Sequence, residues 1–180
     1  MIQQKMNMGN EAPPSVMPAY NGRVLGYLIT SITMATGILT GHFDERLVWA
    51  IPISMLWPHI LYFIIRHLNL DQSSATRENT LLIDGVFVGL IIVLYGFSVT
   101  PSLFAILMAS FSFIVVGSIR TWLLGHLVLI VSIILFSLVF GIKFSGDAPI
   151  ILQIVSALGA TLFVSVTAYY THKQAKALHK

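Results

Sequence analysis

The chain has 180 residues, of which 56% are hydrophobic and only 9% are charged, with a formal net charge of +3. Soluble domains carry about 25% charged residues, so this composition excludes a water-soluble domain and indicates an integral membrane protein. The lack of cysteine excludes disulfides, thiolate metal sites and cysteine nucleophiles, and the small basic excess predicts no nucleic-acid partner.

The first 22 residues are polar, include Pro13 and Pro14, and show no apolar periodicity. We expect residues 1–22 to form a flexible cytoplasmic tail. A cleaved signal peptide would place a short apolar region near the start, followed by a small-residue cleavage site. Here the first apolar run begins late and no such site ends it, so that run is predicted to remain as a membrane span.

Six apolar runs follow, each close to the roughly 20 residues that cross a bilayer core of about 30 Å. They cover approximately residues 24–40, 47–66, 81–99, 102–119, 122–141 and 149–170. The connections between them are mostly short, which favours antiparallel neighbouring helices. Pro101 and Pro149 are predicted to stand at helix starts, where the missing N–H is tolerated. The sequence therefore predicts an all-α integral membrane protein whose residues 23–171 form a six-transmembrane-helix bundle.

The basic residues indicate how this bundle is oriented. If the N-terminus is cytoplasmic, eight of the ten basic residues fall on the cytoplasmic side. These eight are Lys5, Arg23, Arg66, Arg77, Arg120, Lys173, Lys176 and Lys180, whereas Arg46 and Lys143 fall outside. Since short cytoplasmic loops carry the excess of Lys and Arg, both termini are predicted to be cytoplasmic, with Arg66 and Arg120 at the cytoplasmic interface.

The second run contains the sequence Trp57-Pro58-His59. A proline inside a membrane helix frees a backbone carbonyl that must be satisfied again, so Trp57 and Pro58 are predicted to mark a helix kink. An ionisable residue in a membrane span is by default a candidate functional residue. His59 is therefore the first candidate of the chain.

Two further ionisable residues lie at a comparable predicted depth. At a rise of about 1.5 Å per residue, His59 lies roughly 10 Å, Asp84 about 7 Å and His126 about 8 Å from the cytoplasmic helix ends. We expect these three side chains to form a polar sensing layer, in which Asp84 pairs with an imidazole. Two simpler interpretations stay open: His59 only satisfies the carbonyl freed by Pro58, or Asp84 only faces Arg66 or Arg120.

Few cofactors fit these residues. His59 and His126 are the two side chains that would serve as axial ligands of a haem, an alternative to no cofactor at all. A zinc site lacks the ligand spacing such sites have. Because the sequence holds no nucleophile–base motif, phosphate loop or HExxH pattern, we predict no metal site and no catalytic activity in this chain.

Small residues recur at a spacing that lets helices approach closely. Gly85 and Gly89 have GxxxG spacing, as do Gly22 and Gly26. Such pairs serve either packing within the chain or a dimer face, and the sequence does not distinguish the two.

The last run continues beyond residue 170 as good helix formers. Residues 172–180 are predicted to begin a cytoplasmic signalling helix, with Tyr170, Lys173 and Lys176 on the output segment.

Several of these features occur in an order that resembles a known family. They are Trp57-Pro58-His59, the polar loop after it, Asp84-Gly85, Pro101-Ser102 and the helix from Tyr170 to Lys180. Together, over residues 22–180, they resemble the second membrane-associated sensor (MASE) family. That family is the N-terminal membrane domain of bacterial adenylate cyclases and GGDEF diguanylate cyclases.

The resemblance implies a multi-pass protein of the bacterial inner membrane that works as a homodimer and regulates a C-terminal cyclase domain absent from this chain. His126 is not part of the motif. We expect a sensor that passes a signal from a lipophilic or membrane-borne ligand through its sixth helix. The rival hypotheses are a small transporter or channel, for which we find no internal repeat and no midplane site, and a passive membrane anchor.

Overall fold

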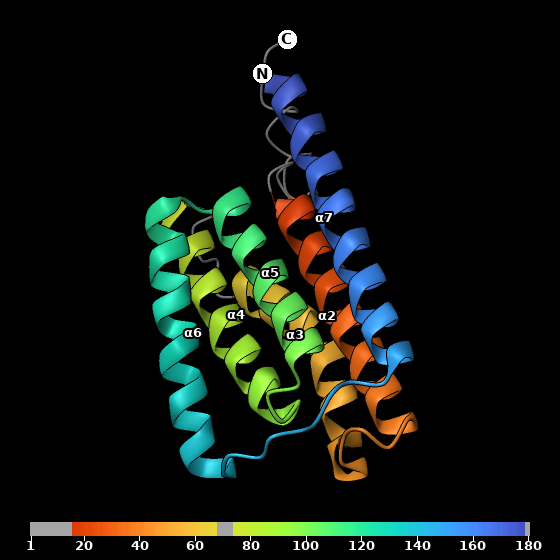
Figure 1. Cartoon of the computed structure of the whole chain (residues 1–180). Helices are drawn as coiled ribbons and strands as arrows, with labels where there is room; N and C mark the ends of the chain where they lie inside the picture. The colour runs from red at the N-terminus through yellow and green to blue at the C-terminus, as the bar shows by residue number, and fades with distance from the viewer. Residues whose placement is uncertain (1–15, 68–73, 179–180) are drawn as a thin grey trace, which may run out of the picture.

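The computed structural model describes residues 16–67 and 74–178, and within these ranges the chain is all α-helical apart from turns and one 3₁₀ helix (Figure 1). The elements are α2 (Val16–Leu39), η2 (Glu45–Trp49), α3 (Ala50–His67), α4 (Ser74–Leu94), α5 (Val99–Val116), α6 (Ile119–Phe140) and α7 (Ile150–Leu178). The prediction of an all-α chain with six long helices is confirmed.

Four segments of the described chain are long and apolar enough to cross a membrane. They are Tyr20–Leu39, Glu45–His67, Ile119–Phe140 and Ile150–Lys173, and Val99–Val115 is a shorter apolar helix. The remaining helix, α4, carries Arg77, Glu78 and Asp84 within 21 residues. The chain is therefore a membrane protein with several candidate spans, four of which length and apolarity identify directly.

The first helix begins earlier than predicted. It starts at Val16 rather than near residue 24, so the prediction of a flexible tail is wrong for residues 16–22, while residues 1–15 lie outside the described residues. Pro18 stands in the first turn of α2, where proline removes no intrahelical hydrogen bond. The polar residues before the apolar run thus extend the helix beyond the apolar segment.

The ends of α4 also differ from the prediction. The helix already includes residues 74–79 of the predicted polar loop, and it ends at Leu94 rather than near residue 99. Gly96 and Phe97 have φ values of 59° and 53°, a left-handed conformation that ends a right-handed helix. Pro101 lies in the first turn of α5, as predicted.

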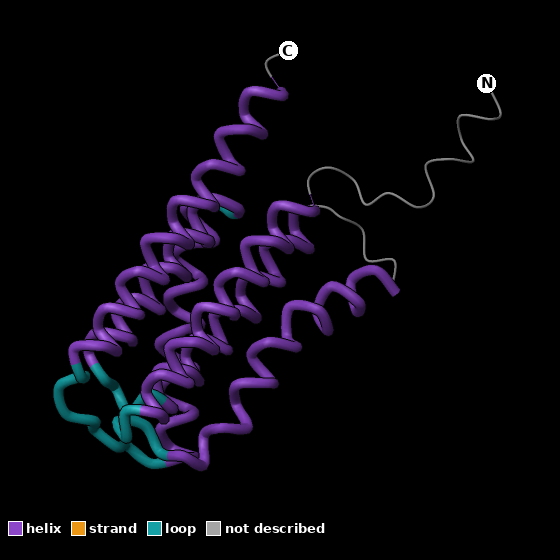
Figure 2. Tube along the Cα trace, turned by 90° about the vertical axis from the view of Figure 1, so that its right-hand side faces the viewer, coloured by secondary structure: helices purple, strands orange, loops and turns teal. Residues whose placement is uncertain are grey.

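The six helices can be described as two groups of three, although α5 packs against α7 of the other group at least as extensively as against α4 and α6 of its own. In the first group, α2 packs against α3 and α7; in the second, α4, α5 and α6 pack against one another. The groups meet where α5 packs on α7 and, less extensively, on α2. In Figure 2 the longer loops gather at one end of the bundle, and α3 lies at its edge. The start of α2 and the end of α7 lie together at the opposite end, where α7 extends beyond the other helices (Figure 1).

Glycines allow the close packing of α4 on α6. The Cα of Gly85 faces the carbonyl oxygen of Gly125, and that of Gly89 faces Ser132. The GxxxG pair of α4 therefore serves packing within the chain. In α2, Gly26 faces the Phe163 ring of α7, whereas a side chain at Gly22 would meet no atom within 4 Å.

Aromatic side chains hold the connections together at one end of the bundle. Phe43 seats on Gly37 and stacks on Tyr95, with ring centroids 4.8 Å apart. His42 Nε2 lies 3.0 Å from the hydroxyl of Ser98, which is fully buried. The first and third connections are thereby held together.

Candidate functional site

Asp84 of α4 is a buried carboxylate that binds three side chains from two other helices. Its Oδ2 accepts a hydrogen bond from Arg23 Nε at 2.6 Å, which is also an ion pair. Its Oδ1 accepts from the Tyr27 hydroxyl at 3.1 Å and from Trp57 Nε1 at 3.4 Å. The charge-assisted bond from Arg23 is the strong one, and the longer bonds from Tyr27 and Trp57 add weaker contacts, so Asp84 joins α2 and α3 to α4.

Arg23 extends this connection. Its Nη2 donates to Thr80 Oγ1 at 2.6 Å, so the guanidinium of Arg23 spans about one turn of α4. The side chains of Arg23 and Asp84 are only 15% and 13% exposed. α2 and α4 belong to different groups of helices. This ion pair therefore connects the two groups, or halves, across the boundary between them, which we call the seam.

Trp57 reaches Asp84 from α3, which otherwise packs on α2 and η2. Its ring stacks on Phe87 of α4, with centroids 3.9 Å apart. Pro58 is buried within α3, and the helix continues past it to His67. Trp57, predicted to mark a kink, is therefore a contact between α3 and α4.

His59 is not a partner of Asp84. It lies on the exposed face of α3, and its Nδ1 is 2.7 Å from the Tyr20 hydroxyl of α2. Trp57 and His59 are two residues apart, which turns their side chains about 200° away from each other at roughly 100° per residue. Since Trp57 faces α4, His59 faces outward, and the predicted pairing of His59 with Asp84 is wrong.

His126 is bound separately between α5 and α6. Its Nδ1 donates to the Trp122 carbonyl at 2.8 Å, and its Nε2 lies 2.8 Å from the Ser110 hydroxyl. The three predicted residues thus do not form one layer. With both nitrogens of His126 engaged and His59 on a different helix pair, the two do not form an axial haem pair within the chain.

The two arginines predicted at the cytoplasmic interface lie at the end of the bundle where α2 begins (Figure 1). Arg66 is in the last turn of α3 and Arg120 in the first turn of α6, and both are exposed. Asp84 pairs with Arg23, so the interpretation in which it only faces Arg66 or Arg120 is wrong. Within the described ranges, no group of three His, Asp or Glu side chains is arranged to hold a metal ion.

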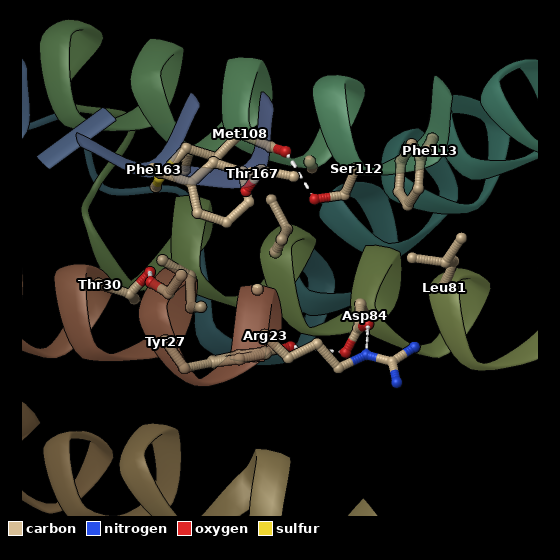
Figure 3. Close-up of a pocket in the computed structure, with 16 residues that line it drawn as sticks. Arg23, Tyr27, Thr30, Leu81, Asp84, Met108, Ser112, Phe113, Phe163 and Thr167 are labelled. Atoms are coloured by element: carbon tan, nitrogen blue, oxygen red, sulfur yellow. Dashed lines mark hydrogen bonds and ion pairs between the residues drawn. The ribbon is translucent and has the colours of Figure 1, made fainter. Parts of the chain in front are cut away.

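A cavity of about 90 Å³ lies beside the ion pair, between α2, α4, α5 and α7 (Figure 3). Arg23 and Asp84 form part of its wall, and Ser112 and Thr167 lie across from them. Asp84 could be singled out from the sequence, but the cavity could not be predicted, because most of its walls are ordinary apolar positions of four separate helices.

Two of the hydroxyls in the cavity wall bond to their own helix, and a third has no partner among the described residues. Thr30 donates to the Gly26 carbonyl and Ser112 to the Met108 carbonyl, both at 3.0 Å. Thr167 Oγ1 is buried and forms no hydrogen bond to the described residues. Thr167 stands on α7, which extends beyond the other helices to Leu178 (Figure 1).

Comparison with known proteins gives a single finding. Neither the curated proteins nor the solved structures include a match to this chain. Among protein families, the MASE2 domain matches residues 18–108, just over half of the chain. The matched segment runs from α2 into α5 and contains Arg23, Trp57 and Asp84. On this match the chain belongs to the MASE2 family of membrane sensor domains.

Proposed function

We propose that this MASE2 domain is a six-span sensor of the bacterial inner membrane that signals through α7 to a nucleotide cyclase domain joined after it. In this proposal the domain works as a homodimer, because adenylate and diguanylate cyclases both need two catalytic units. One observation carries the proposal: the helix that leaves the bundle also forms a wall of the cavity, through Phe163 and Thr167.

The arrangement of the halves supports this role for α7. It packs against α2 in one group of helices and against α5 in the other, so a shift of one group relative to the other displaces α7 or rotates it. A ligand changes such an equilibrium only through different affinities for the two states. A cavity at the seam provides that difference, because its volume depends on how the two groups are placed.

The contacts among the turns determine which end of the bundle moves most when the two groups of helices shift. Phe43 and Tyr95 hold the first and third connections together, and Ser145 N–H donates to the Gly96 carbonyl at 2.7 Å, which adds the fifth connection. A relative movement of the halves is therefore expected to be largest at the opposite end, where α7 leaves the bundle.

The topology of the proposal gives a direct prediction. Reporter proteins fused before Met1 and after Lys180 are both expected to read cytoplasmic, because the basic residues favour that side and the described ends of α2 and α7 lie at one end of the bundle. Alkaline phosphatase and fluorescent protein fusions measure this. A periplasmic signal from either fusion would refute the six-span topology.

The signalling role is tested by changing the phase of α7. We expect the activity of a fused adenylate cyclase domain to rise and fall when one to four alanines are inserted after Leu178, because each residue rotates the helix by about 100°. Activity should recover near the fourth insertion, which completes about one turn. The measurement is cyclic AMP produced per amount of protein in the membrane.

The matched control inserts the same alanines after Met8, where no change in activity is expected. A flat response after Leu178 would mean that the domain only brings two catalytic domains together, and the passive-anchor hypothesis would then replace the sensor.

A further inference from the structure

We propose that the connection between α6 and α7, residues 141–149, binds the membrane surface at its own end of the bundle. In this proposal Ile142 and Phe144 of the connection, together with Phe97, enter the lipid, and Lys143 contacts lipid phosphate groups. The proposal goes beyond the signalling role and does not depend on it, because it requires only that the chain spans a membrane.

The α6–α7 connection exposes large apolar side chains outside any helix. Residues 141–149 are neither helix nor strand, and they run along the end of the bundle opposite the start of α2 (Figure 1). Ile142 and Phe144 are 62% and 80% exposed. Contact of such side chains with water is unfavourable, so both require an apolar environment that the bundle does not supply.

The lipid around α6 supplies that environment. Helix α6 is one of the candidate membrane spans and ends at Phe140, and its last residues Leu138, Val139 and Phe140 are all exposed. Phe144 follows four residues later, which places it at most about 14 Å from the end of the span. The apolar surface of the span therefore continues into the connection, which favours lipid over a second protein as the partner.

Phe97, between α4 and α5, is an independent sign that this surface has a role. Its φ of 53° is rare for a bulky residue, and such strain persists mainly at functional positions. The positive φ of Gly96 has a packing reason, since a Cβ there would meet Ser145. At Phe97 the same backbone conformation places the ring beside that of Phe144, with centroids 5.5 Å apart. The strained residue thus adds a second aromatic ring to the exposed apolar surface.

The polar groups of the connection fit a position at the level of the lipid head groups. Lys143 stands between the two exposed apolar residues, is itself exposed, and forms no ion pair with any described residue. A lysine at a membrane surface extends its ammonium group to the polar head groups. The backbone is held to the bundle, because Ser145 N–H donates to the Gly96 carbonyl and Gln153 Nε2 of α7 donates to the Ala148 carbonyl, both at 2.7 Å. The apolar side chains of the connection are therefore left for the lipid.

The test places nitroxide spin labels on the whole chain in nanodiscs of phosphatidylethanolamine and phosphatidylglycerol. Because the chain has no cysteine, Ile142→Cys provides a single labelling site. The label should collide with oxygen, which concentrates in lipid, more often than with a water-soluble nickel chelate. The ratio of the two rates should approach that of Leu127→Cys, on the exposed face of α6.

The matched control is Asp147→Cys, because Asp147 is exposed and belongs to the same connection. We expect the ratio at position 142 to exceed that at position 147 about threefold or more, as for a side chain buried at the boundary of head groups and acyl chains. Equal ratios at the two positions would overturn the proposal.

Two substitutions separate lipid contact from packing within the bundle. Phe144→Ser should raise the nickel collision rate of the label at position 142, whereas Phe63→Ser, which removes an exposed ring from α3, should not. Phe97→Gly should also raise it, although glycine tolerates the positive φ and stability in mixed micelles should not fall. Lower stability with an unchanged collision rate would show that Phe97 packs within the bundle, and its place in the lipid surface would be refuted.

A second copy of the chain is the alternative partner of this surface. A photoreactive p-benzoylphenylalanine in place of Phe144 keeps an aromatic ring there and should form adducts with phospholipid, identified by mass spectrometry. Cross-linked dimers in place of lipid adducts would overturn the proposal. No step uses a cyclase, so a flat response to alanine insertion would refute the signalling role and leave the lipid contact standing.

Discussion

Replacing Asp84 by Asn is expected to lower the free energy of unfolding of the domain by about 3 kcal/mol, since removing one member of a buried ion pair leaves the other charge uncompensated. Arg23 would keep its charge in a side chain that is only 15% exposed. Arg23→Met should have an effect of similar size, because it leaves the Asp84 carboxylate with only the weaker donors Tyr27 and Trp57.

The double variant, Arg23→Met with Asp84→Asn, should be clearly less destabilised than the sum of the two single variants, because neither charge is then left alone. The measurement is a double-mutant cycle by chemical unfolding in mixed micelles. The control cycle pairs Asp84→Asn with His59→Ala, for which we expect additivity within about 0.5 kcal/mol. Additivity between Arg23 and Asp84 would mean that the ion pair does not hold the seam.

Asp84 could be recognised from the sequence, whereas its main partner could not. An acidic residue within an apolar run predicts that some partner exists, and that expectation holds. Arg23, however, lies 61 residues earlier in the chain. At the border of the first apolar run a basic residue has an ordinary explanation, namely the orientation of the helix in the membrane. Sequence alone gives no reason to direct its side chain inward.

The prediction of a polar layer was wrong because two coordinates place a side chain in a helix bundle, and depth in the membrane is only one of them. His59, Asp84 and His126 were assigned similar depths, but the rotation of each helix about its own axis decides which neighbour a side chain meets. His59 lies on the exposed face of α3 beside Tyr20 of α2, and His126 faces α5. That rotation depends on packing between helices, which the sequence does not state. Trp57 could likewise be recognised as part of a motif, but its contact with Asp84 could not be predicted, because it depends on the same rotation.

The number of helices was predictable because apolar runs and turn residues alternate clearly. The helix ends were less predictable, because hydropathy shows where the apolar residues begin and not where the backbone hydrogen bonds of the helix begin. Val16 and Ser74 start helices within polar sequence. These extensions matter for the site, because they place Arg23 and Thr80 within regular helices whose side chains face each other across the seam.

Replacing Gly89 by Ala is expected to destabilise the domain, whereas Gly22→Ala is expected to leave it unchanged or slightly more stable. A Cβ at position 89 would lie 2.7 Å from Ser132 Cβ and 3.1 Å from the Leu129 carbonyl oxygen of α6. The contact with backbone is relieved only if α6 moves as a whole, and overpacking of this kind costs about 1–3 kcal/mol.

The two variants differ only in what the added methyl group meets. At Gly22 it meets no atom within 4 Å, so only the better helix propensity of alanine remains, a gain of up to about 1 kcal/mol. Because alanine gains the same helix propensity at both positions, unfolding of both variants in the same mixed micelles should give values about 1–3 kcal/mol apart, the cost of overpacking. Equal stabilities would show that α4 and α6 are not in close contact. The GxxxG pair of α4 would then be free for a second copy of the chain, a result that cross-linking at Gly89→Cys would reveal directly.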